Sequence, residues 1–199
     1  PGQFRPQYEM PRTDAKQLQI EFSGRKAALS APFGINDMGE VFIRVQKLNE
    51  NAHKLVRVVI STEAAAIFVD ILDAKDMWPY SIRNFSDYEF FIYQSDPNIN
   101  EEGRRVSQVP FKPIYYRIPP KSAMPYAWDY PAAQYKELVL RSGSRERYVH
   151  LAEIGTLMPM KIGKGADGTT KIVDLNVVAD GTIQSLIISN YDPKTSMYQ

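Results

Sequence analysis

The chain repeats itself, and this repeat constrains its fold more than any other feature of the sequence. Tyr8-Glu9-Met10-Pro11 aligns with Trp128-Asp129-Tyr130-Pro131 at an offset of 120 residues. Further along the chain the offset falls to 117, where Lys54-Leu55-Val56 aligns with Lys171-Ile172-Val173. A small change of offset between two aligned blocks is typical of a loop insertion or deletion. Self-similarity at a fixed spacing indicates a repeat architecture, and the alternative is chance similarity between two β-rich segments.

The position of the repeat predicts how the chain is divided. The stretch from Trp78 to about Pro125 has no counterpart upstream, because its partner would lie before residue 1. We therefore expect residues 1–75 to form the C-terminal part of one β repeat and residues 76–199 to form one nearly complete β repeat. Repeat units gain stability by burying faces against their neighbours, so we expect the chain to be a piece of a longer array.

Alternation of apolar and polar residues predicts strands in both copies. Every second residue is apolar from 54 to 60, and residues 173–177 repeat that pattern, as half-buried strands do. Asp180-Gly181 stands between two such runs, where a hairpin turn is expected. Fourteen prolines argue against long helices. We predict an all-β fold of tandem β-sandwich-like repeats, the first one incomplete.

Composition argues against several functional classes. The net charge is +1 and no basic stripe is visible, so we expect no nucleic-acid partner. The chain has no cysteine, and His53 and His150 are its only histidines, which leaves no zinc-binding spacing. No apolar run approaches the roughly 18 residues that span a bilayer. We expect no metal, no cofactor, no membrane span and no enzymatic activity.

One glycine motif resembles a nucleotide-binding fingerprint. Residues 163–168 read Gly-x-Gly-x-x-Gly, but this fingerprint must follow a strand and open a helix, whose N-terminus holds the pyrophosphate. The residues from 169 onward alternate as a strand does. We therefore predict a glycine-rich loop between two strands.

Asn84 is the most informative single polar residue. With the period of a strand, Tyr80, Ile82 and Asn84 share one face. An amide on an apolar face needs backbone partners, because an unpaired buried amide costs about 1–3 kcal/mol. We expect a structural role first; the alternative is that Asn84 only marks where the strand ends. The aromatic residues between 78 and 130 form either a sandwich core or a groove for proline-containing peptides.

Three segments resemble a known family. Trp78-Pro79-Tyr80-Ser81-Ile82-Arg83-Asn84 is similar to the start of a repeat in the adaptor-binding domain of the vacuolar protein sorting-associated protein thirteen family. Residues 118–131 resemble the family's Pro-x-x-Ser…Tyr-Ala-Trp-Asp element, and residues 29–35 resemble the stretch before a repeat's final strands. Tyr8-Glu9-Met10-Pro11 departs from the family's Trp-Asp-x-Pro, although it keeps an aromatic, an acid and the proline.

The resemblance implies a function. It implies a domain of six all-β repeats, of which this chain would hold the last two, within a very long bridge-like lipid transfer protein. It implies Pro-x-Pro-containing adaptor proteins of mitochondrial, endosomal or other organelle membranes as partners. It implies a cytoplasmic protein that is peripheral at organelle membrane contact sites. It also places Asn84 at the position of an asparagine that each repeat of the family carries.

A Pro-x-Pro peptide is extended, so we hypothesise that it adds as a strand to a sheet edge near the repeat boundary, at residues 173–178 or 183–189. The alternative function is a peripheral lipid-binding β-domain, which would need a basic or apolar face. An enzyme is the third hypothesis, and no nucleophile or metal motif supports it. The candidate peptide-binding or repeat-defining residues are Asn84, Tyr80, Ile82, Val173, Leu175, Val177, Leu186 and Ile188.

Overall fold

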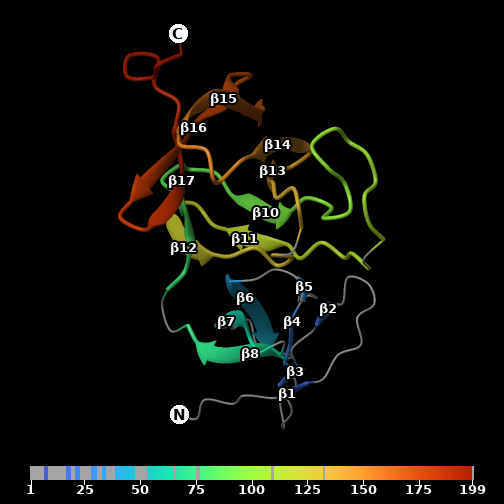
Figure 1. Ribbon diagram of the computed structural model, residues 1–199. Helices are drawn as coiled ribbons and strands as arrows, with labels where there is room; N and C mark the ends of the chain where they lie inside the picture. The colour runs from blue at the N-terminus through green and yellow to red at the C-terminus, as the bar shows by residue number, and fades with distance from the viewer. Residues whose placement is uncertain are drawn as a thin grey trace. The chain divides into compact units, whose positions relative to one another are not determined.

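Strands and irregular segments, without a helix, make up the part of the chain that the computed structural model describes (Figure 1). The described residues are 7–8, 17–18, 21–22, 28–30, 33–34, 39–47, 53–64, 66–74, 77–108, 110–131 and 133–198. Of the upstream copy of residues 128–131, only Tyr8 lies within them. The prediction of an all-β fold is confirmed. No helix in these ranges is long and apolar enough to cross a bilayer.

The chain divides into two compact units. The first unit comprises Pro1–Trp78 and Ala127–Gln134, and the second comprises Pro79–Tyr126 and Tyr135–Gln199. The segment Ala127–Gln134 therefore belongs to the first unit, although its sequence lies deep inside the predicted second repeat. The repeat boundary at residue 76 stays a prediction about the sequence, whereas these units describe how the chain packs.

The first unit is built on one large sheet. Its strands run in the order β1-β8-β7-β6-β4-β3, and all their pairings are antiparallel. Their bounds are β1 (Gln7–Tyr8), β3 (Glu21–Phe22), β4 (Ala28–Ser30), β6 (Gly39–Lys47), β7 (His53–Glu63) and β8 (Ala66–Asp73). Strands β2 (Gln17–Leu18) and β5 (Phe33–Gly34) form a separate antiparallel pair.

The second unit contains two sheets (Figure 1). The four-stranded sheet has the order β11-β10-β13-β14, with bounds β10 (Phe90–Gln94), β11 (Tyr116–Ile118), β13 (Leu138–Ser142) and β14 (Arg145–Val149). The five-stranded sheet has the order β12-β9-β17-β16-β15, with bounds β9 (Tyr80–Asn84), β12 (Ser122–Tyr126), β15 (Gly155–Lys164), β16 (Thr170–Asp180) and β17 (Ile183–Asn190). Strands β9 and β17 are parallel, which joins the two ends of the unit's chain.

Both sheets of the second unit bury one face. Burial alternates along β10, where Phe90 and Ile92 are buried, and along β16, where every second residue from Val173 to Val177 is buried. The Tyr116 ring of one sheet meets the Tyr126 ring of the other edge-on, with centroids 6.1 Å apart. Two sheets that each bury one face and share aromatic contacts form a sandwich-like core.

The final hairpin of the repeat seen in the sequence occurs twice in the structure. The bounds of β16 and β17 each lie 117 residues beyond those of β7 and β8. The register follows the same offset, because Glu63 pairs with Ala66 and Asp180 pairs with Ile183. The two copies of this hairpin are thus equivalent in backbone pairing, and the Asp180-Gly181 turn lies between strands as predicted.

Candidate functional site around Asn84

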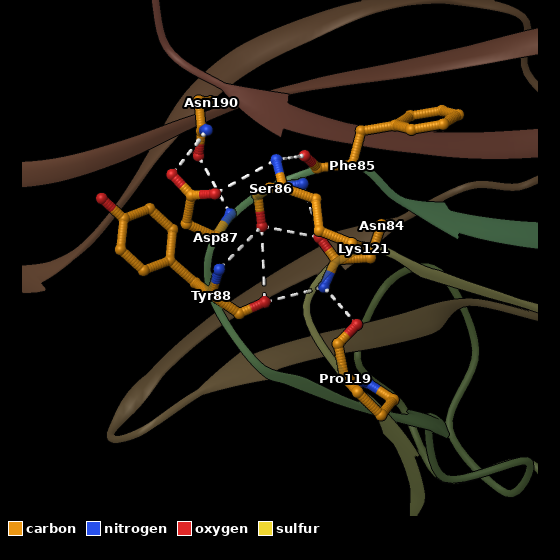
Figure 2. Close-up of polar contacts among 8 residues, drawn as sticks. All are labelled: Asn84, Phe85, Ser86, Asp87, Tyr88, Pro119, Lys121 and Asn190. Carbon is orange, nitrogen blue, oxygen red and sulfur yellow. Dashed lines mark hydrogen bonds and ion pairs between the residues drawn. The ribbon is translucent and has the colours of Figure 1, made fainter.

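Asn84 ends β9, and its side chain connects two turns of the second unit (Figure 2). Its amide nitrogen donates hydrogen bonds to the backbone carbonyls of Tyr88 at 2.7 Å, Pro119 at 3.0 Å and Ile118 at 3.4 Å. Its oxygen accepts from the Ser86 backbone N–H at 3.0 Å and from the Ser86 hydroxyl at 2.6 Å. The residue is 1% exposed. Asn84 therefore fastens the turn after β9 to the turn between β11 and β12.

This bonding defines what Asn84 does chemically. Both amide hydrogens and the carbonyl oxygen are engaged by protein groups, so none is left to bind a peptide in this state. Ser86 is also buried, and its hydroxyl accepts a hydrogen bond from the Tyr88 N–H at 3.2 Å. A buried polar network that is fully satisfied specifies one local geometry. The role that we propose for Asn84 is to shape this end of the unit.

Lys121 extends the network to the surface. Its backbone lies in the left-handed region with φ at 55°, and its N–H donates to the Ser86 carbonyl at 3.3 Å. Its ammonium group donates to the Phe85 carbonyl at 2.5 Å and pairs with the Asp87 carboxylate at 3.1 Å. Figure 2 shows these contacts converging on one turn while the Phe85 ring points away from them. Phe85 is 53% exposed.

Asp87 ties the same turn to the end of β17. The Asn190 side chain accepts from the Asp87 backbone N–H at 3.1 Å and donates to the Asp87 carboxylate at 2.9 Å. The hydrogen bond from Lys121, then that from Asn190, and then the positive charge of Lys121 lower the pKa of Asp87 below its usual range. Phe85 adds a backbone bond of 2.8 Å from its N–H to the Ile188 carbonyl.

The other candidates of β9 have different surroundings. Ile82 is fully buried and Tyr80 is half-buried. Their strand lies between β12 and β17, with Tyr80 opposite Tyr126 in one pairing and opposite Gln184 in the other. Ile82 belongs to the core, and Tyr80 presents part of its side chain to solvent.

The candidates on β16 and β17 lie in the core and not on a sheet edge. Val173, Leu175, Val177, Leu186 and Ile188 are each 0% exposed. Strand β16 is paired with β15 and β17, and strand β17 is paired with β16 and β9. A peptide cannot add to a strand whose backbone is paired on both sides. Strand addition at residues 173–178 or 183–189 is therefore wrong for this structure, and these five side chains belong to the core.

Most of the clustered aromatic residues are core or part-core residues. Tyr116, Tyr126 and Trp128 are buried, whereas Tyr115 is 51% exposed. The Tyr115 ring lies against the Tyr93 ring, with centroids 4.8 Å apart. The core interpretation holds for these three buried residues, whereas Tyr115 and Phe85 are mostly exposed and Tyr80 is partly exposed.

The glycine-rich segment is a turn, as the sequence predicts. It connects β15 to β16, so it is followed by a strand and not by a helix. The Asp167 carboxylate accepts from the Thr169 hydroxyl at 2.6 Å and from its N–H at 3.0 Å, and these bonds lower the pKa of Asp167. Within the described ranges no three acidic, histidine or cysteine side chains gather as metal ligands.

Asn84 is recognisable in the sequence, whereas most of the residues that meet at the turn after it are not. Ser86 follows Asn84 by two residues, a spacing at which a side-chain oxygen commonly accepts from the backbone, so a local signal existed. Lys121 and Asn190 lie 37 and 106 residues away from Asn84, and their polar side chains carry no local signal. Only the pairing of β9 with β12 and β17 brings them to this turn.

Comparisons with known proteins agree with the family resemblance of residues 29–35, 78–84 and 118–131. Residues 1–135 match the family model described as "Vacuolar-sorting associated protein 13, adaptor binding domain". The chain is 41% identical over 198 residues, or 100% of its length, to the "Intermembrane lipid transfer protein VPS13" of Chaetomium thermophilum. It spans 6% of the length of that relative. The matched family segment includes Asn84, Ser86 and Lys121, and Asn190 lies beyond it.

Proposed function

The chain belongs to the family of VPS13 adaptor-binding domains, and from that premise we propose that it recognises Pro-x-Pro motifs of organelle adaptor proteins without catalysing a reaction. Binding of this kind would bring a lipid transfer protein to membrane contact sites, as a cytoplasmic protein that is peripheral to the organelle. The observation that carries the proposal is a sheet edge, β12, whose preceding turn is braced by the Asn84 network.

Strand β12 is the edge that the contacts leave most available in the second unit. It borders the five-stranded sheet and pairs only with β9 among the described strands. Pro125 lies within it, and proline within a sheet is typical of an edge strand. Ala123 and Pro125 are exposed. A peptide that adds to β12 would therefore extend the sheet next to the turn held by Asn84 and Lys121.

The other edges of the second unit are less suitable. The outer carbonyls of β15 are engaged, since Arg147 donates to Met158 O at 2.7 Å and to Pro159 O at 3.1 Å, and the Tyr198 hydroxyl donates to Thr156 O at 3.3 Å. Strand β14 is rich in charged side chains, which protect an edge against strand addition. Strand β11 has only three residues.

A Pro-x-Pro segment suits addition to such an edge. Its two prolines lack N–H groups and hold φ near −65°, so the segment is extended before it binds and loses little conformational entropy. The residue between the prolines keeps one N–H donor, while every residue keeps its carbonyl. Alternate side chains of an added strand point to one face of the sheet, which places both prolines on the same face.

The test is a titration of this chain with a fluorescently labelled Pro-x-Pro peptide from an adaptor protein, beside the same peptide with both prolines replaced by alanine. We expect saturable binding to the first peptide and at least tenfold weaker binding to the second. Hydrogen exchange on the complex then locates the site, with slowed exchange expected at the Ala123 amide in β12. Equal affinity for the two peptides would overturn the proposal.

A matched variant separates the edge from the fold. Ala123→Pro removes one N–H from the exposed β12 edge, and Ala152→Pro places a proline at an exposed position outside the strands. Melting curves establish that each variant is folded. Loss of binding in Ala123→Pro alone supports the β12 edge, whereas binding that survives in a folded Ala123→Pro protein moves the site elsewhere.

A further inference from the structure

A pocket of about 460 Å³ opens beside the loop that follows β10 in the second unit. The loop supplies Asp96, Asn100 and Glu101 to its wall, and the start and end of the β13–β14 region supply Tyr135, Glu137 and Tyr148. Three of the lining residues carry carboxylates and none of them carries a basic side chain. The pocket belongs wholly to the second unit and shares no residue with the Asn84 network.

The loop that forms this wall is held in one conformation by its own side chains. The Asn98 side chain accepts from the Ser107 hydroxyl at 2.6 Å, and the Val106 N–H donates to the Asn98 carbonyl at 2.8 Å. The Asn100 side chain accepts from the N–H groups of Glu102 at 3.1 Å and Arg104 at 2.9 Å. A loop fixed in this way presents a preformed wall, which lowers the entropic cost of binding.

Glu137 is the reason to expect a cation. Its side chain is only 14% exposed, and burial of a carboxylate is unfavourable unless an opposite charge compensates it. It pairs with His150 at 3.7 Å, and the histidine is charged only when protonated. Asp96 and Glu101 line the same space, so the negative charge of Glu137 is reinforced. The pocket therefore has an excess of negative charge around a largely buried carboxylate.

Tyr135 reports the same negative environment and offers an aromatic face. Burial first, then a hydrogen bond with Glu137 and the charges of Glu137, Glu101 and Glu153, raise the pKa of Tyr135 to about 12. Its hydroxyl lies 3.0 Å from His150 Nε2. Tyr148 contributes a second ring to the wall and is 55% exposed. Aromatic faces attract cations, and a guanidinium group stacks on them while it pairs with carboxylates.

We propose that this pocket is a docking site for an arginine side chain of a partner protein. The guanidinium pairs with Glu137 at the base of the pocket and with Glu101 at its rim, and it stacks on Tyr135 or Tyr148. Arginine suits the site better than lysine because its planar head pairs with carboxylates and stacks on rings at the same time. All residues of the site belong to the second unit, and the proposal does not depend on Pro-x-Pro recognition.

The experiment is an NMR titration of the ¹⁵N-labelled chain with acetyl-arginine-amide and, separately, with acetyl-citrulline-amide, which has nearly the same shape and no charge. We expect chemical-shift changes at Gly103 and Tyr148 for the arginine compound, and at least tenfold weaker binding of the citrulline compound. Added salt is expected to weaken the arginine complex, because it screens the charge pairs. Equal shifts for the two compounds at these residues would overturn the proposal.

Two neighbouring glutamates provide a matched control. Glu101 lines the pocket, whereas Glu102 points its carboxylate to Arg104 at 3.4 Å and lies outside the lining. We expect Glu101→Gln to weaken arginine binding several-fold, Glu137→Gln to weaken it about tenfold or more, and Glu102→Gln to leave it unchanged. Glu101 is exposed, so its substitution tests the pocket even if the Glu137 variant fails to fold. Undiminished binding in Glu101→Gln and in a folded Glu137→Gln protein would contradict the assignment.

Discussion

Strand β7 pairs with β8 in the first unit in the same register in which β16 pairs with β17 in the second, yet the strands beside these hairpins differ. Strand β8 is bordered by the two-residue antiparallel strand β1, which pairs Gln7 with Phe68. Strand β17 is bordered by the five-residue parallel strand β9, which brings Asn84 and its network with it. The hairpin is thus the same in both units, whereas the strand that borders its second strand differs between them.

The other side of the hairpin differs as well. In the first unit β4 pairs directly with β6, so that one sheet continues from β8 to β3. In the second unit β14 and β15 belong to separate sheets, and Arg147 connects them by donating to two carbonyls of β15. The same hairpin therefore lies within a continuous six-stranded sheet in the first unit and within one layer of a sandwich-like core in the second.

The outer face of the hairpin shows how a neighbouring segment completes a unit. Leu55 is buried in a cluster with Ala74 and Ala127, against which Phe42 and Trp78 pack. The equivalent residue in the second unit, Ile172, is half-buried. Ala127 comes from a segment that lies within the predicted second repeat by sequence. One unit is therefore completed by a short segment from elsewhere in the chain, which a linear division of the sequence does not predict.

The largest expected effect is a loss of stability in one unit when a buried residue of its hairpin is shortened, while the other unit is unaffected. Leu175 and its counterpart Val58 are both 0% exposed. We expect Leu175→Ala to lower the free energy of unfolding of the second unit by about 2–5 kcal/mol and Val58→Ala to lower that of the first by about 2–3 kcal/mol, because fewer carbons are removed. Native-state hydrogen exchange of β7 and β16 measures each unit separately. Equal losses in both units from either variant would show that the units unfold together.

The next effect concerns the network that accompanies β9. Asn84→Ala removes the amide donor from the carbonyls of Tyr88 and Pro119 and the acceptor from the N–H and hydroxyl of Ser86, so we expect a loss of about 2–4 kcal/mol in the stability of the second unit. A melting curve and the hydrogen exchange of residues 119–121 measure it. The first unit serves as the internal control, and its exchange should not change.

Asn84→Asp refines this test. Aspartate keeps an oxygen that accepts from Ser86, but it cannot donate to the carbonyls of Tyr88 and Pro119. We expect it to lose most of the stability that Asn84→Ala loses. If the aspartate variant were as stable as the natural protein, the donated hydrogen bonds would not be the ones that hold the two turns together.

A smaller effect distinguishes the turns of the two hairpins. Gly181 opens one turn with φ at 61°, and Ala64 occupies the equivalent place in the other with φ at 50°. A side chain in this left-handed region costs about 1–2 kcal/mol. We expect Gly181→Ala to destabilise the second unit by about that amount and Ala64→Gly to stabilise the first by less than about 1 kcal/mol, since glycine also frees the unfolded chain. Denaturant unfolding of both variants checks the opposite signs.

The smallest effect is the pH dependence of the surface turn at Asp87. Lys121 and Asn190 lower the pKa of Asp87 in the folded state, so its stabilising contribution is present above the pKa of the unfolded chain. That contribution is lost as the pH falls through the lower, folded value. We expect Asp87→Asn to reduce this acid dependence slightly, and NMR titration of the Asp87 carboxyl to give a pKa below that of aspartate in an unstructured peptide, about 3.9. A normal Asp87 pKa would contradict the pairing with Lys121.

Local signals predicted a large part of this structure. Alternation predicted β7 and β16, the Asp180-Gly181 pair predicted the turn between β16 and β17, and the aligned copies predicted a repeat, whose two hairpins share one register in the structure. The apolar positions of these strands were assigned to one face, and the described ones are buried. The burial of Asn84 also agrees with its predicted place on the same face of its strand as Ile82. The alternation of side chains along a strand and the residue preferences of turns involve only a few neighbouring residues, so both can be recognised in the sequence.

The edges of the sheets, in contrast, could not be predicted from local patterns in the sequence. The sequence placed a peptide-binding edge on residues 173–178 or 183–189, but β9 and β15 cover those strands on their outer sides. It gave no sign that Lys121 and Asn190 would meet at the turn after Asn84, or that Ala127 would join the first unit. Each of these facts depends on a contact between segments far apart in the chain.

Neighbouring residues and their copies were sufficient to predict the repeat, the strands of its hairpins and the family of this protein. Contacts between distant segments set which strands are internal, which edge is accessible, and which polar side chains meet near Asn84 and at the acidic pocket. The physical reason is that a strand has two hydrogen-bonding sides with the same backbone chemistry. Nothing within the strand itself determines which distant segment pairs with either side.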